Sequence, residues 1–132
     1  MIRSLLIVIL IVAFLILSIP ILIVEWIIGK FSRQAKDYSS LRLVQGAFKL
    51  IMFMTGVKLT VIGEENVPKD KAVLYVGNHR SYFDVVMTYA RCPRLTGYVA
   101  KIEMLRYPLL RDWMKNLYCL FLDRDDIKAG LK

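Results

Sequence analysis

Hydrophobic residues follow three successive patterns along the chain: a continuous apolar run, a helical periodicity and then short extended runs. Leu5 to Val24 is a run of twenty uncharged residues, interrupted only by Ser18 and Pro20. At 1.5 Å per residue, a helix of this length reaches roughly 30 Å, the thickness of the hydrocarbon core of a bilayer. The run therefore predicts a transmembrane anchor over residues 1–30.

Two other interpretations of the apolar run fit less well. A signal peptide has a shorter apolar core of about 7–15 residues and then small residues at its cleavage site, and neither is found here. A helix that is apolar on every side can hardly be buried by a chain of 132 residues. Trp26 follows the run where an interfacial indole is expected, and the basic residues come next: Lys30, Arg33 and Lys36.

From Leu41 to Met54 the apolar residues recur at helical spacing, and Arg42, Gln45 and Lys49 fall on another side of the predicted helix. Gly56 follows as a stop signal. The pattern indicates a basic amphipathic helical region over residues 31–57. Two placements stay open for it: the helix lies in the membrane interface, or it packs on the domain that follows.

After Gly56 the periodicity changes from helical to extended, and residues 58–132 are predicted to form a separate domain. Strands are expected where short apolar runs are bounded by turn residues: Lys58–Ile62, Ala72–Val76, Thr96–Ala100 and Cys119–Leu122. Helices are expected at Ser81–Tyr89 and Leu109–Leu117. Alternating strands and helices predict an α/β fold with a mostly parallel sheet.

Composition and charge narrow the class of protein. With 57% hydrophobic residues the chain is not intrinsically disordered, and its two cysteines and single histidine form neither a disulfide framework nor a zinc finger. Of the net charge of +8, residues 30–58 carry +5, from six basic residues and one acidic residue. This basic block directly follows the apolar run, which places the later residues on the cytoplasmic side and makes nucleic acid a poorer partner than anionic lipid headgroups.

The histidine lies directly after the predicted strand Ala72–Val76, where open α/β sheets bind ligands. On one continuous helix, His79 and Asp84 would lie about 140° apart around the axis. They can meet only if His79 lies in the loop and Asp84 in the first turn of a helix that begins at Ser81. Asp84 would then hold one ring nitrogen and leave the other as a base. The alternative is a structural capping box, Ser81-x-x-Asp84, with His79 an ordinary loop residue.

Four segments together are similar to the glycerolipid acyltransferase family. They are Gly63-Glu64-Glu65-Asn66-Val67-Pro68, Asn78-His79-x4-Asp84, Val99-Ala100-Lys101-Ile102-Glu103 with Tyr107-Pro108, and Leu120-Phe121-Leu122-Asp123-Arg124. The subgroup that they resemble makes phosphatidic acid from 1-acyl-glycerol 3-phosphate. The resemblance covers most of the chain, and the ordered set of segments is far more specific than the histidine motif alone. It implies an α/β acyltransferase domain whose first part is residues 58–132, behind transmembrane or interfacial helices.

The resemblance also implies roles for individual residues. His79 would be the general base and Asp84 would orient it. Arg124 and Lys101 would bind the phosphate of lysophosphatidic acid, although a salt bridge or a solvated surface explains either residue as well. The acyl donor would be acyl-CoA or an acyl carrier protein, without metal or other cofactor. The protein would be attached to the cell membrane, single-pass or monotopic, with its catalytic part facing the cytoplasm.

One departure from the family concerns its third motif, E-G-T-R, which normally follows the second and is not found before Lys132. We therefore expect the chain to be the amino-terminal part of a longer protein and weakly active by itself. Two rival functions remain. One is a membrane-anchored module that binds anionic lipid without catalysis, and the other is an acyltransferase with a different phosphate-bearing acceptor.

Overall fold

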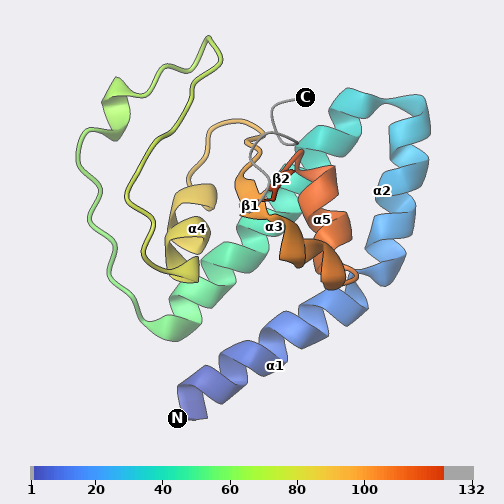
Figure 1. Ribbon diagram of the computed structural model, residues 1–132, viewed down its shortest axis with the longest axis horizontal. Helices are drawn as coiled ribbons and strands as arrows, with labels where there is room; N and C mark the ends of the chain where they lie inside the picture. Colours follow the sequence, from blue (N-terminus) through green and yellow to red (C-terminus); the bar gives the residue numbers. More distant parts are fainter. Residues whose placement is uncertain (1, 124–132) are drawn as a thin grey trace.

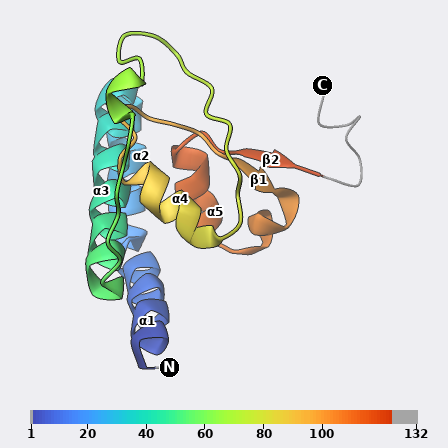
Figure 2. The same cartoon turned by 90° about the vertical axis from the view of Figure 1, so that its left-hand side faces the viewer.

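The computed structural model describes residues 2–123 (Figure 1). Three helices come first: α1 (Ile2–Leu17), α2 (Ile19–Phe31) and α3 (Arg33–Thr55). After a long connection come α4 (Tyr82–Tyr89), β1 (Val99–Lys101), α5 (Leu110–Asn116) and β2 (Leu120–Leu122), with short 3-10 turns η1 (Glu64–Asn66) and η2 (Ile102–Arg106). Figure 2 shows α2 and α3 on one side, α4 and α5 in the middle, and the two strands on the opposite side.

The apolar run forms two helices instead of one. α1 from Leu5 and α2 meet at Ser18 with a bend of 46°. Pro20 is the cause, because proline lacks the N–H that would continue the helical ladder and its ring clashes with the preceding turn. Within the described residues, no helix by itself is long and apolar enough to cross a membrane; the bent pair passes that test by length and composition only.

α3 is longer than the predicted helix and packs on the domain that follows it. It begins at the N-cap Ser32, whose hydroxyl accepts a hydrogen bond from the Ala35 amide at 3.2 Å, and ends at Gly56 in the left-handed conformation that suits glycine. Leu41 and Val44 are buried in the core with Tyr89, Trp113, Cys92 and Leu117. Two placements were open for the helix predicted at Leu41–Met54, and in the structure this helix packs on the domain that follows it.

The fold is mostly helical, so the α/β prediction holds only for a small parallel sheet. β1 and β2 pair with Ala100 opposite Phe121, close to two of the predicted strands. Gly97 permits this pairing because the chain passes directly over the carbonyl of Tyr118, where a Cβ atom would lie 2.2 Å from the oxygen. The helices predicted at Ser81–Tyr89 and Leu109–Leu117 are confirmed as α4 and α5.

The strand predictions for Lys58–Ile62 and Ala72–Val76 are wrong. Both segments run without regular structure through the long connection between α3 and α4, and Ile62, Leu74 and Val76 are 86–91% exposed. A strand requires a neighbouring strand for its backbone hydrogen bonds, and neither segment has one within residues 2–123. The alternation of apolar residues indicated extended backbone but contained no information about the partner.

α5 attaches the later part of the chain to the bend between α1 and α2. The indole Nε1 of Trp113 donates a hydrogen bond of 2.8 Å to the hydroxyl of Ser18, which is fully buried. The Trp113 ring also lies 5.9 Å from that of Phe14 in α1. A second polar contact joins α2 to α3, where the buried carboxylate of Glu25 accepts hydrogen bonds from the hydroxyls of Ser39 and Ser40.

Candidate active site

The histidine motif lies at the start of α4. Ser81 is the N-cap, and its hydroxyl accepts a hydrogen bond of 3.1 Å from the Phe83 amide. The side chain of Asp84 reaches back to accept bonds from the amides of Arg80 and Ser81, at 2.7 and 2.8 Å. This is a complete capping box. It fixes the carboxylate of Asp84 over the amino-terminal end of the helix.

The same carboxylate faces the histidine. Oδ2 of Asp84 lies 3.4 Å from Nδ1 of His79, which precedes the helix by three residues. The two interpretations of the sequence are therefore compatible, because one oxygen both caps α4 and approaches the imidazole. The amides of Arg80 and Ser81, and to a smaller extent His79, hold the pKa of Asp84 below its ordinary value. The carboxylate is consequently ionised at neutral pH.

This pair has the geometry of an oriented base. With its proton on Nδ1 toward Asp84, the imidazole would present Nε2 as an acceptor on its other side. The side chain of His79 is 57% exposed and that of Asp84 is 32% exposed, so a substrate hydroxyl can reach the ring. The arrangement suits removal of a proton from a substrate; within the described residues the motif offers no serine positioned as a nucleophile, since the Ser81 hydroxyl is used by the helix.

The carboxyl-terminal end of α4 is held by α3. The amide nitrogen of Gln45 donates hydrogen bonds to the carbonyls of Tyr89 and Cys92, at 3.2 and 2.8 Å. Gln45 is only 3% exposed, so its predicted place on the polar side of the helix is wrong. Its partners explain the burial, because the last carbonyls of a helix have no partners within the helix and need donors from elsewhere.

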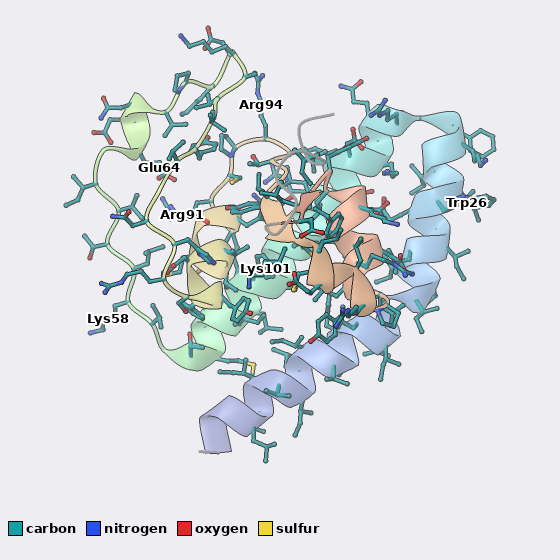
Figure 3. All side chains as sticks on the ribbon, viewed as in Figure 1. Trp26, Lys58, Glu64, Arg91, Arg94 and Lys101 are labelled. Atoms are coloured by element: carbon teal, nitrogen blue, oxygen red, sulfur yellow. The ribbon has the colours of Figure 1, made fainter. Side chains whose placement is uncertain are left out.

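The long connection is tied to α4 by an ion pair. The guanidinium of Arg91, just after α4, contacts both carboxylate oxygens of Glu64 in η1, with Nε 2.9 Å from Oε1 (Figure 3). Glu64 belongs to the segment Gly63–Pro68 that contributed to the family resemblance. Because of this pair, the connection that leaves α3 first contacts the carboxyl-terminal end of α4 and then returns to the amino-terminal start of α4.

The two predicted phosphate-binding residues are placed differently. Lys101 is the last residue of β1, exposed, and stands in register with Leu122 of β2. Within the described residues, neither a hydrogen bond nor an ion pair connects Lys101 with His79 or Asp84. Arg124 lies outside the described residues. Residues 2–123 contain no group of three His, Cys, Asp or Glu side chains that could hold a metal ion.

Comparison with known proteins assigns the family. A sequence model of the Acyltransferase family matches residues 58–132, more than half of the chain. The chain belongs to this acyltransferase family. It is 32% identical over 129 residues to a probable 1-acyl-sn-glycerol-3-phosphate acyltransferase of Mycoplasma pneumoniae, and 29% identical over 91 residues to a 1-acyl-sn-glycerol-3-phosphate acyltransferase of Borreliella burgdorferi.

Those alignments cover 86% and 67% of this chain but only 47% and 35% of the two relatives. The chain thus spans at most about half the length of either curated relative. No solved structure matches it.

Sequence reasoning missed the residues that position α4. Gln45 looked polar and exposed, and Glu64 and Arg91 are 27 positions apart with no shared motif. One signal was available for Gln45, which lies between Val44 and Phe48 on the side of α3 that carries the core residues. A polar residue on an apolar helical face indicates a buried hydrogen bond.

Proposed function

We propose that the protein containing this chain transfers an acyl group from acyl-CoA or an acyl carrier protein to the free hydroxyl of 1-acyl-glycerol 3-phosphate, which gives phosphatidic acid. The observation that carries the proposal is the 3.4 Å approach of His79 Nδ1 to Asp84 at the start of α4, inside the region that matches the acyltransferase family. The names of the two curated relatives support the choice of acceptor.

In the proposed reaction, His79 removes the proton of the acceptor hydroxyl through Nε2, and Asp84 stabilises the imidazolium that forms. The oxygen attacks the thioester carbonyl, the carbon–sulfur bond breaks, and the thiolate takes the proton back from His79. Transfer is direct, without an acyl-enzyme. Lys101 and Arg124 are proposed to bind the acceptor phosphate, a role that suits ammonium and guanidinium groups.

We also propose that the protein is attached to one face of the cell membrane. Support comes from Trp113, which is bonded to Ser18 at the bend of α1 and α2. If the pair crossed the bilayer, Ser18 would lie near its middle and α5 would follow it there with Arg111, Asp112 and Lys115, at a cost of several kcal/mol for each charge. Attachment from the cytoplasmic face keeps α5 out of the bilayer, and it brings the basic block of residues 30–58 to anionic headgroups.

The test is an acyl-transfer assay on protein expressed from the complete reading frame that encodes this chain, with lysophosphatidic acid and each thioester donor. We expect His79→Ala to lower kcat by about 10²–10⁴-fold, the range for a general base. Asp84→Asn should lower it as well. Asp70→Asn removes an exposed carboxylate from the same connection and should leave kcat unchanged.

Wild-type activity in His79→Ala would overturn the proposal. Lipid binding without conversion by the wild type would favour the non-enzymatic module, and conversion of another phosphate-bearing acceptor would change the substrate but keep the reaction. Weak turnover by residues 1–132 alone stays a prediction, tested by running the same assay on that chain.

A further inference from the structure

A groove of about 670 Å³ lies between α1 and α3, away from the candidate active site. We call it the α1–α3 groove. Its lining consists of Phe14 from α1 and, from α3, of Tyr38, Ser39, Arg42, Leu43, Gly46, Ala47 and Leu50. None of these residues belongs to α4, to the connection with His79 or to the sheet. The volume is within the range of sites that hold small organic ligands, roughly 300–1,000 Å³.

The surface of the groove is almost entirely apolar, and the polar residues of its lining lie at one end only. Its polar end is formed by Tyr38, Ser39 and Arg42, and its apolar end by the residues from Leu43 to Leu50. From Tyr38 to Leu50 the helix rises roughly 18 Å, which is the length scale of an acyl chain. The lining contains one positive charge and no acidic residue. Such a groove complements an amphiphile with an anionic head and a long apolar tail.

Arg42 has donors to spare at the polar end. Its guanidinium lies 5.1 Å from the ring of Tyr38 and donates one hydrogen bond, of 3.2 Å, to the side-chain oxygen of Gln45. A guanidinium has five N–H groups in a planar fork that suits a phosphate. Ser39 is less available, because its hydroxyl is bonded to Glu25.

Gly46 keeps the middle of the groove open. A Cβ atom at this position would meet nothing within 4 Å, so the backbone there borders open space. Glycine inside a helix is destabilising by about 1 kcal/mol relative to alanine. Nothing in the packing of the described residues requires glycine here, whereas a larger side chain would fill the groove.

We propose that the α1–α3 groove binds one acyl chain of an anionic bilayer phospholipid and that Arg42 binds the phosphate of its headgroup. The site is separate from the acceptor and donor sites of acyl transfer, and the proposal does not depend on the enzymatic activity. Through Gln45, Arg42 is also connected to the carboxyl-terminal end of α4.

The experiment uses the full chain in phosphatidylcholine vesicles doped with phosphatidylglycerol that carries a photoactivatable group on its acyl chain. We expect the label in peptides of α1 and α3. Gly46→Leu should reduce this labelling at least about tenfold, equivalent to about 1.4 kcal/mol. Gly46→Ala adds a methyl group without filling the groove and should keep the labelling. Circular dichroism checks that both variants fold.

A second pair of variants tests the headgroup contact. Arg42→Gln should lower phosphatidylglycerol labelling about fivefold, the effect of one surface charge near an anionic membrane. Lys71→Gln removes an exposed cation of the long connection that lies outside the basic block of residues 30–58, and this variant should label like the wild type.

Equal labelling of folded Gly46→Leu and wild type would overturn the proposal, as would equal losses in Arg42→Gln and Lys71→Gln. A third outcome would assign the groove to another occupant. If Gly46→Leu abolishes chemical cross-linking between two copies of the chain while the lipid label is absent from α1 and α3 throughout, the groove is an interface between copies and the lipid site is wrong.

Discussion

The helical part of the molecule and the long connection that carries His79 are built in opposite ways. Around α3 and α5, apolar side chains are buried, and hydrogen bonds such as that of Trp113 to Ser18 join polar groups among them. In residues 57–81, large apolar side chains such as Leu74 and Val76 are exposed. Two polar contacts tie that connection to α4 and the residue just after it, one from His79 to Asp84 and one from Glu64 to Arg91. Stability and candidate chemistry therefore reside in different parts of the chain.

α4 is the element that joins the two parts. Its carboxyl-terminal end is bonded to Gln45 in the buried layer, and its amino-terminal end carries Asp84 beside His79. From this difference between the two parts we expect that substitutions in the helical part change the free energy of unfolding. Substitutions in the connection should change activity with little effect on unfolding.

The largest effect on stability is expected for Trp113→Ala. The indole is 3% exposed and contacts both Phe14 and Ser18, so its removal leaves a cavity and leaves the Ser18 hydroxyl with only its bond to the Leu15 carbonyl. We expect the free energy of unfolding to fall by about 3–5 kcal/mol, measured by chemical denaturation in a mild detergent.

The other tryptophan provides the matched control. The side chain of Trp26 is 65% exposed and points away from the molecule (Figure 3), and Trp26→Ala should change the free energy of unfolding by no more than about 0.5 kcal/mol. Similar losses in the two variants would contradict the separation of a packed part from an exposed one.

An intermediate effect is expected for Gln45→Leu, which tests the junction. Leucine fits an apolar environment but leaves the carbonyl of Cys92 without its donor, at a cost of about 1–3 kcal/mol, while the carbonyl of Tyr89 keeps its bond from the Cys92 amide. Gln34→Leu changes an exposed glutamine of the same helix and should be nearly neutral. Hydrogen exchange measured on α4 should rise in Gln45→Leu alone; protection equal to that of the wild type would show that α3 does not hold this helix.

The sequence predicted the elements whose signals are local. Ser81 as an N-cap, Gly56 as a helix end and the apolar spacing of α5 each depend on a few neighbouring residues, and each is found in the structure. The bend at Pro20 was marked in the sequence as an interruption, but its direction depends on what packs against it. The strands predicted at Lys58–Ile62 and Ala72–Val76 failed because pairing depends on segments distant in sequence.

For the candidate site, the loop-then-helix geometry of His79 and Asp84 followed from a spacing argument, and the structure brings the two side chains together. The contacts that hold α4 in place beside that pair could not be predicted from the sequence. Gln45 is 44 positions from Tyr89, and no local rule connects them. A motif can identify reacting groups from the sequence, but the contacts that position them are properties of the folded chain.

The smallest expected effect concerns the dependence of stability on pH in Asp84→Asn. The pKa of Asp84 is lowered from 3.8 by the amides of Arg80 and Ser81 first and by His79 after them. A lowered pKa in the folded state adds stability at pH values above the unfolded pKa, and that stability is lost as the pH falls through the folded pKa. Asparagine still accepts hydrogen bonds at this position but carries no charge.

The wild type should therefore be more stable than Asp84→Asn at neutral pH, and thermal unfolding should show that this difference is constant down to about pH 4 and shrinks below it. Asp70→Asn controls for the loss of one carboxylate from the connection, and its difference from the wild type should lack this change. A difference that persists unchanged at lower pH would mean that the charge of Asp84 does not stabilise the start of α4. The capping box would then act through its neutral hydrogen bonds, and the orientation of His79 would need another source.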